Sequence, residues 1–160
     1  MAQETRLQFD YHRSVAPIMW VFFAIAVIEL VVVHLLVALT WPLVGWTLTI
    51  LSAIGIVWIL LGIRSFRRLP HELVGDRLTV RFGNMKQVRL GLGQVDRVIG
   101  SWEDGAVQAK NAINLAGIAY PNRCIELVEP LEKGRSRVFV RLDDPEPFDR
   151  ALSAAGVETP

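Results

Sequence analysis

Two long runs of apolar residues dominate the first part of the chain, at positions 15–39 and 41–63. A helix of about 20 apolar residues crosses the hydrocarbon core of a bilayer, so each run is long enough to span a membrane. Only the corner at Thr40, Trp41 and Pro42 separates the runs. So short a connection places the two helices antiparallel and adjacent. The pattern therefore predicts a transmembrane α-helical hairpin over residues 15–63.

The corner and the ends of the runs carry residues typical of helix and membrane boundaries. Thr40 is predicted to cap the second helix, and Pro42 suits its first turn, where no amide partner is needed. Tryptophan is enriched at the interfaces between membrane and water. The tryptophans expected to act as interfacial anchors are Trp20 and Trp58 at one end of the hairpin and Trp41 and Trp46 at the other.

The hydrophobic pattern changes from helical to alternating after Pro70. Leu78, Val80 and Phe82 alternate with polar residues, which is typical of a half-buried strand. Further strands are predicted over residues 85–90, 94–102, 124–129 and 137–142, whereas residues 106–120 fit a strand, a loop or a short helix. Closely spaced short strands favour an antiparallel barrel or sandwich.

The chain is predicted to end in a helix. Asp143, Asp144 and Pro145 suit its start, and Gly156 suits its stop. Apolar residues lie between them at helical spacing, at positions 148, 151, 152 and 155. The predicted organisation is thus a polar N-terminal segment (1–14), which forms a short cytoplasmic tail or lies at the membrane surface, the hairpin (15–63) and a cytoplasmic β-rich domain with one C-terminal helix (64–160).

The distribution of charge around the two runs predicts how the hairpin is oriented in the membrane. The four charged residues of segment 1–14 balance, the corner carries no charge, and Arg64, Arg67 and Arg68 follow the second run. Positive residues beside membrane spans stay on the cytoplasmic side, so both termini are predicted to be cytoplasmic. The single cysteine, Cys124, excludes an intrachain disulfide and fits a reducing compartment.

Three parts of the domain carry distinctive segments: LTVRFG (78–83), VRL (88–90) with VDRV (95–98), and VFVRLDDPEPF (138–148). These segments resemble the opening strands, and the last strand with its following helix, of bacterial pleckstrin-homology-like (PH-like) domains. Many members of that family are small bacterial membrane proteins with a two-helix hairpin before the domain. The resemblance implies a PH-like fold and a multi-pass location in the bacterial inner membrane. It implies no catalytic or lipid-binding residue.

Polar residues interrupt the apolar runs at positions expected to make contacts within the membrane. They are Glu29, His34, Thr47, Thr49 and Ser52. Residues equally distant from the corner lie at the same depth in an antiparallel hairpin, which predicts Glu29 beside Ser52 and His34 beside Thr47. An ionisable side chain at this depth is unfavourable unless it is paired or functional.

Two interpretations of Glu29 remain open at this point. In the first, it forms a hydrogen bond with Ser52 or with a backbone carbonyl group, which holds the two helices together. In the second, either Glu29 or His34 faces another subunit or a polar cavity, because the five-residue step between them turns about 140° and the two side chains cannot both face the second helix. The hairpin is therefore predicted to contact another membrane protein or a second copy. A proton relay through both residues is a third, weaker reading.

Basic residues gather just after the hairpin. Residues 64–99 carry eight basic and three acidic side chains, a net charge of +5, whereas residues 100–160 carry a net charge of −3. Near an anionic leaflet, each basic residue contributes about 1 kcal/mol of attraction. The residues expected to contact lipid headgroups or an acidic partner are Arg64, Arg67, Arg68, Arg77, Arg81 and Arg89. A solvated strand face with routine flanking charge is the simpler interpretation.

Sequence patterns of enzymes and cofactor sites are missing. The three histidines are far apart, and the glycines at 91 and 93 lack the third glycine of a dinucleotide loop. Cys124 lies in an apolar strand and is expected in the core. No catalytic residue, metal, cofactor or nucleic-acid partner is therefore predicted.

These features favour a non-catalytic accessory, assembly or scaffolding subunit of a larger membrane complex. A lipid- or ligand-sensing PH-like module at the membrane surface is the first alternative. An oligomeric proton or solute transport unit is the second.

Overall fold

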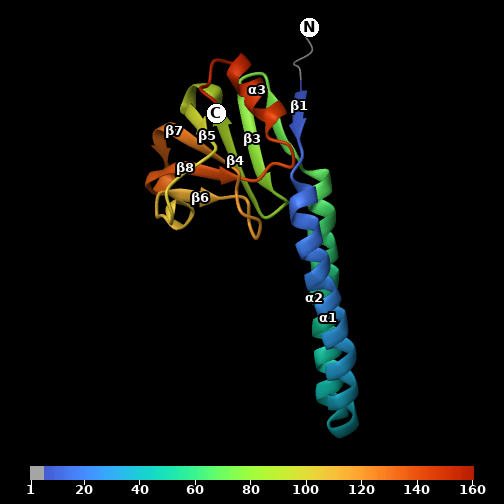
Figure 1. Ribbon diagram of the computed structural model, residues 1–160. Helices are drawn as coiled ribbons and strands as arrows, with labels where there is room; N and C mark the ends of the chain where they lie inside the picture. Colours follow the sequence, from blue (N-terminus) through green and yellow to red (C-terminus); the bar gives the residue numbers. More distant parts are fainter. Residues whose placement is uncertain (1–5) are drawn as a thin grey trace.

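Two long helices extend side by side from one edge of a β domain in the computed structural model, which describes residues 6–160 (Figure 1). Helix α1 (His12–Thr40) and helix α2 (Pro42–Arg68) are joined at the far end and form the hairpin. Both are long and apolar enough to cross a membrane, by length and composition. Each continues beyond its predicted run toward the domain, at residues 12–14 and 64–68.

The helices pack on each other through one stripe on each, and most of the remaining surface is exposed beyond the ends that contact the domain. The less exposed positions include 19, 23, 26, 30, 33 and 37 of α1, and 45, 49, 52, 56, 59 and 63 of α2. Steps of alternately four and three residues average 3.5, the repeat of a left-handed coiled coil. Large apolar side chains cover the outer faces, and Leu39 and Leu43 near the corner are each 85% exposed.

Thr40 does not cap α2, so that prediction is wrong. It is the last residue of α1, and its hydroxyl group donates to the carbonyl groups of Leu36 and Val37 (3.3 and 3.2 Å). The carbonyl oxygen of Val37 also accepts from the backbone N–H of Trp41 at 2.8 Å, so the threonine adds a second hydrogen bond there, as threonines inside helices commonly do. Trp41 is the residue between the helices, and Pro42 lies in the first turn of α2, as predicted.

The domain contains two four-stranded sheets. The first has the order β1 (Arg6–Phe9), β2 (His71–Val74), β3 (Arg77–Phe82) and β4 (Lys86–Gly91), with all neighbours antiparallel. The second has the order β5 (Val95–Ile99), β7 (Arg123–Leu131), β8 (Arg135–Val140) and β6 (Ala112–Asn114), in which only β6 and β8 are parallel. Short 3₁₀ turns lie at Leu92–Gln94, Ala106–Gln108 and Glu132–Gly134.

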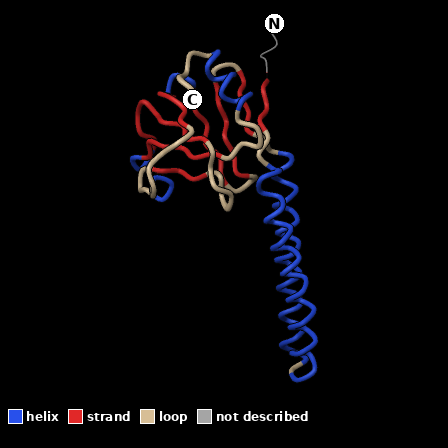
Figure 2. The backbone as a smooth tube through the Cα atoms, viewed as in Figure 1, coloured by secondary structure: helices blue, strands red, loops and turns tan. Residues whose placement is uncertain are grey.

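The two sheets enclose one hydrophobic core, and helix α3 (Glu146–Ala154) covers part of it (Figure 2). Leu78 and Val80 come from the first sheet and Ile125 and Val138 from the second, and all four are fully buried. Phe148 of α3 is also fully buried. The two sheets and the C-terminal helix agree with the sandwich alternative, and Gly156 ends the helix as predicted, with a φ of 88°.

The N-terminal segment contains a strand that the sequence did not predict. Residues 6–9 form β1, which pairs with β2, and the Phe9 ring packs edge-on against Phe148 with 5.2 Å between ring centroids. The two helices of the hairpin have similar lengths, so the chain leaves the hairpin beside the point where it entered. The hairpin is therefore inserted between two neighbouring strands of one sheet. Residues 1–5 of the predicted tail lie outside the described residues.

Candidate functional site

One polar contact joins the two helices inside the hairpin. Nδ1 of His34 and the hydroxyl group of Thr49 are hydrogen-bonded. The same hydroxyl group lies 2.8 Å from the carbonyl oxygen of Gly45 and donates to it, so it accepts from the imidazole. The ring of Trp46 packs edge-on against His34, with centroids 5.9 Å apart.

His34 contacts Thr49 instead of the predicted Thr47. Thr47 is exposed, and its hydroxyl group donates to the carbonyl oxygen of Leu43 at 3.0 Å. Two causes explain the difference. Thr49 belongs to the packing stripe of α2, whereas Thr47 lies on the opposite side of the helix. In addition, helical side chains lean toward the N-terminus of their helix, which carries His34 of α1 away from the corner and toward Thr49.

Glu29 lies on the outer face of the hairpin. Its side chain is exposed, whereas Ser52, expected at the same depth, belongs to the inner stripe of α2. No hydrogen bond joins Glu29 to Ser52 or to another residue of the described range 6–160. His34 and Glu29 thus lie on different faces of α1, as their five-residue spacing requires. Of the two interpretations, the geometry favours a carboxyl group that faces outward.

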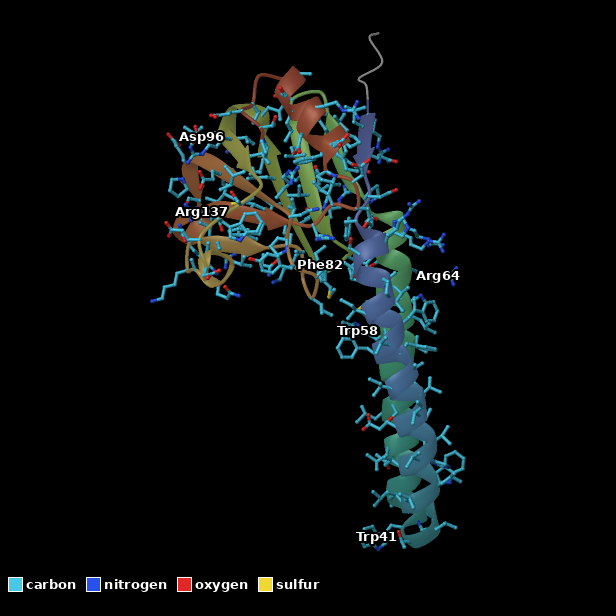
Figure 3. All side chains as sticks on the ribbon, viewed as in Figure 1. Trp41, Trp58, Arg64, Phe82, Asp96 and Arg137 are labelled. Carbon is cyan, nitrogen blue, oxygen red and sulfur yellow. The ribbon has the colours of Figure 1, made fainter. Side chains whose placement is uncertain are left out.

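The four tryptophans expected as interfacial anchors are exposed on the hairpin: Trp20, Trp41, Trp46 and Trp58. Figure 3 shows Trp41 at the tip farthest from the domain, and Trp58 much closer to the domain. The exposed indole rings therefore gather toward the two ends of the apolar surface.

The structure divides the six predicted basic residues into two groups. Arg64, Arg67 and Arg68 line a hollow of about 350 Å³ at the end of α2. The second group lies on the outer face of the first sheet and lines a hollow of about 380 Å³. Its arginines are Arg77, Arg81 and Arg89.

An acidic residue neutralises part of the second group. The carboxylate of Glu72 forms ion pairs with Arg6 and with Arg81, the latter at 3.3 Å. Partial burial acts to raise the pKa of Glu72, but the two guanidinium groups outweigh it and lower the pKa. Arg6 was not among the predicted residues, because its partner is brought close only by the pairing of β1 with β2.

An aromatic cluster connects the hairpin to the domain. The Tyr11 ring stacks on His71, with centroids 4.6 Å apart, and its hydroxyl oxygen accepts a hydrogen bond from the backbone N–H of Gly83 (2.7 Å). Burial raises the pKa of Tyr11 to about 12. Val15, Phe66 and Ala119 are buried beside Tyr11. We call this cluster, together with the neighbouring Phe82, the joint.

Asp143 clamps the start of α1, although the sequence predicted it as part of the cap of α3. Its carboxylate accepts hydrogen bonds from the backbone N–H groups of Arg13 and Ser14 and from the Ser14 hydroxyl group, each at 2.9 Å. Free N–H groups at a helix N-terminus favour a carboxylate, and the fold presents α1 to this loop. Of the two aspartates, Asp144 is the one bonded to the start of α3: its carboxylate accepts a hydrogen bond from the backbone N–H of Glu146 at 3.2 Å.

The single cysteine lies inside the domain. Cys124 is fully buried, as predicted, and burial raises the pKa of its thiol to about 12, which leaves it inert as a nucleophile. Within the described residues, His, Cys, Asp and Glu side chains form no group of three suited to a metal ion.

Comparison of the chain with protein-family models, curated proteins and solved structures gives no match.

Proposed function

We propose that this chain is a non-catalytic accessory or scaffolding subunit of a membrane complex, inserted in the bacterial inner membrane with both termini in the cytoplasm. One observation carries the proposal: Glu29 lies exposed on the outer face of an otherwise apolar hairpin. The hairpin would contact the partner, and the domain would extend the contact into the cytoplasm.

Three features support a membrane-spanning hairpin. The shorter helix, α2, has 27 residues and is thus about 40 Å long, more than the roughly 30 Å of a hydrocarbon core. Almost none of either helix is buried within the protein, unlike the core helix of a soluble domain. Tryptophans near both ends and arginines at the domain end suit the two interfaces, and the arginines favour a cytoplasmic domain.

The PH-like assignment of the domain is part of the same proposal. Two packed sheets followed by one helix support it, with the buried side chains of Phe148 and Leu152 placing that helix against the core. The assignment concerns the fold and carries no ligand with it, because a fold alone does not define a function.

Glu29 is the reason for a partner within the membrane. An acidic side chain at the centre of a lone hairpin is unfavourable by about 2.5–3.5 kcal/mol. A polar group on a neighbouring membrane protein, or on a second copy, would remove much of this penalty by a hydrogen bond. The joint and the Asp143 clamp would then hold the domain at a fixed position relative to that partner.

We expect Glu29→Leu to release the partner. Losing a hydrogen bond of about 1–2 kcal/mol within a membrane weakens association roughly tenfold. Affinity purification of tagged protein from native membranes, followed by quantification of stoichiometric companions, measures the effect. Glu29→Gln keeps a hydrogen-bonding side chain and should retain the partner.

Thr47→Leu is the matched control for this experiment. Thr47 is also exposed on the hairpin, but its hydroxyl group is satisfied by its own helix, so the companion should remain. Equal recovery from the Glu29→Leu and wild-type proteins, or a lone monomer from both, would contradict the proposal. Retained companions with activity lost in Glu29→Gln would instead favour a transport unit.

The hollow lined by Arg77, Arg81 and Arg89 favours a second candidate function, the sensing of an anionic ligand at the membrane surface. Salt-sensitive binding of the full chain to a soluble anion would support it. The full chain is required, because a fragment that begins after the hairpin lacks β1.

A further inference from the structure

A crevice lies where the end of α2 meets the turn between β3 and β4. It has a volume of about 500 Å³. Its lining residues are Leu61, Arg64, Ser65, Arg68, Leu69 and Asn84. The crevice therefore combines two guanidinium groups and an amide with two leucine side chains.

Close packing against α2 fixes the wall of the crevice that the β3–β4 turn forms. Gly83 approaches α2 so closely that a Cβ atom there would lie 2.6 Å from the Ser65 hydroxyl oxygen. The N–H of Gly83 is also bonded to the buried Tyr11 hydroxyl group. The position of Asn84, the next residue, is thus fixed relative to α2 by packing in the joint.

The crevice extends from the joint toward the apolar part of the hairpin. Phe66 lies in the joint, and Leu61 is five residues, or about 7.5 Å, farther along α2 in the direction of the corner. Leu61 is 58% exposed. The polar mouth of the crevice, at Arg64, Arg68 and Asn84, and its apolar end, at Leu61, thus follow each other along the expected direction of the membrane normal.

The arginines of the crevice have no acidic partner among residues 6–160. Arg6, Arg81, Arg97, Arg123 and Arg137 all form ion pairs, whereas Arg64 and Arg68 form none there. Arg64 and Arg68 are four positions apart, so their side chains emerge on the same face of α2, about one turn apart. Two such guanidinium groups suit the oxygens of one phosphate. Figure 3 shows Arg64 at the domain end of the hairpin.

We propose that the crevice binds one anionic phospholipid, with its phosphate between Arg64, Arg68 and Asn84 and its acyl chains along Leu61. This inference rests on the membrane-spanning hairpin of the proposed function. A lipid fits better than a soluble phosphate compound, because Leu61, on the membrane side of the two arginines, would lie against a soluble ligand's polar surface but suits an acyl chain. The bound lipid would fill the space between hairpin and domain and fix their relative position from the membrane side.

The test is lipid retention by the purified full-length protein, measured by native mass spectrometry after detergent extraction, and titration of the delipidated protein with phosphatidylglycerol. The wild type should keep one anionic phospholipid. Arg64→Gln combined with Arg68→Gln should lower its retention at least tenfold. Asn84→Asp, which places a negative charge at the mouth on an exposed turn, should do the same without removing an arginine.

The double variant Arg77→Gln with Arg89→Gln is the matched control, because it removes the same charge from the other hollow and should retain the lipid. Equal losses from both double variants would overturn the proposal in favour of general electrostatic attraction. Displacement of the lipid by millimolar glycerol phosphate, or a wild type without bound lipid, would also overturn it. Companions retained through Glu29 would leave the proposed function standing in each case, whereas a wild-type protein found only in the soluble fraction would overturn both.

Discussion

Replacing Gly117 with alanine will lower the free energy of unfolding by about 3 kcal/mol. Gly117 has a φ of 64°, and a Cβ atom at this position would lie 2.2 and 2.3 Å from two carbons of the Phe82 ring. A left-handed conformation disfavours alanine by roughly 1–2 kcal/mol, and an overpacked site adds about 1–3 kcal/mol. Chemical unfolding of the full chain in detergent micelles, followed by circular dichroism, measures the change.

Gly105→Ala is the control that separates the two causes. Gly105 has a φ of 83°, but no atom lies within 4 Å of the position its Cβ would occupy. This variant should lose only the roughly 1–2 kcal/mol of the backbone contribution. If both variants are equally destabilised, the close approach of Gly117 to Phe82 adds nothing to the backbone effect.

Local patterns were enough to predict the elements that carry their own signal. The two apolar runs, the alternating strand at Arg77–Phe82 and the amphipathic final helix all appear in the structure. Their hydrophobic periods arise because each element buries one face or lies in an apolar medium. The strands β1, β2 and β6 have only three or four residues each, too few to show a period, and the pairings of β1 with β2 and of β6 with β8 join segments that are distant in sequence.

Contacts of the candidate site could be predicted only where the depth of a residue along the hairpin determines its neighbours. His34 was expected against a threonine of α2 and is bonded to one, but the choice of Thr49 depends on the packing stripe and on the tilt of helical side chains. The crevice at Arg64 and Asn84 had no signal in the sequence, because it arises from the close approach of the β3–β4 turn to α2. Asp143 shows the same limitation. Its sequence neighbours predicted that it caps α3, whereas in the folded protein its carboxylate binds the N-terminus of α1.

The burial of His71 leads to the second prediction with a large effect: the folded protein loses stability in mild acid. The imidazole is fully buried, accepts a hydrogen bond from the N–H of Arg81 at 3.0 Å and donates from Nε2 to the carbonyl oxygen of Arg141 at 3.3 Å. These two bonds occupy both ring nitrogens of the neutral form. Burial disfavours the charged form and lowers the pKa from 6.5 to about 4.

The direction of the effect follows from which state binds the proton more readily. The unfolded chain protonates His71 near pH 6.5, whereas the folded chain does so only near pH 4. The stabilising contribution of the neutral imidazole is therefore complete above pH 6.5 and is lost as the pH falls toward 4. At 1.36 kcal/mol per pKa unit, the loss reaches about 3 kcal/mol. Unfolding experiments at a series of pH values should show this slope in the wild type.

His71→Gln should flatten the slope between pH 6.5 and 4, because glutamine can replace both hydrogen bonds and does not titrate. Glu72 affects stability in a lower pH range. Its pKa is lowered, so its contribution is present above about pH 4.5 and is lost only below that value. A slope that persists in His71→Gln between pH 6.5 and 4 would assign the acid sensitivity to another group. A slope that disappears would show that the neutral imidazole under Tyr11 stabilises the connection between the hairpin and the domain.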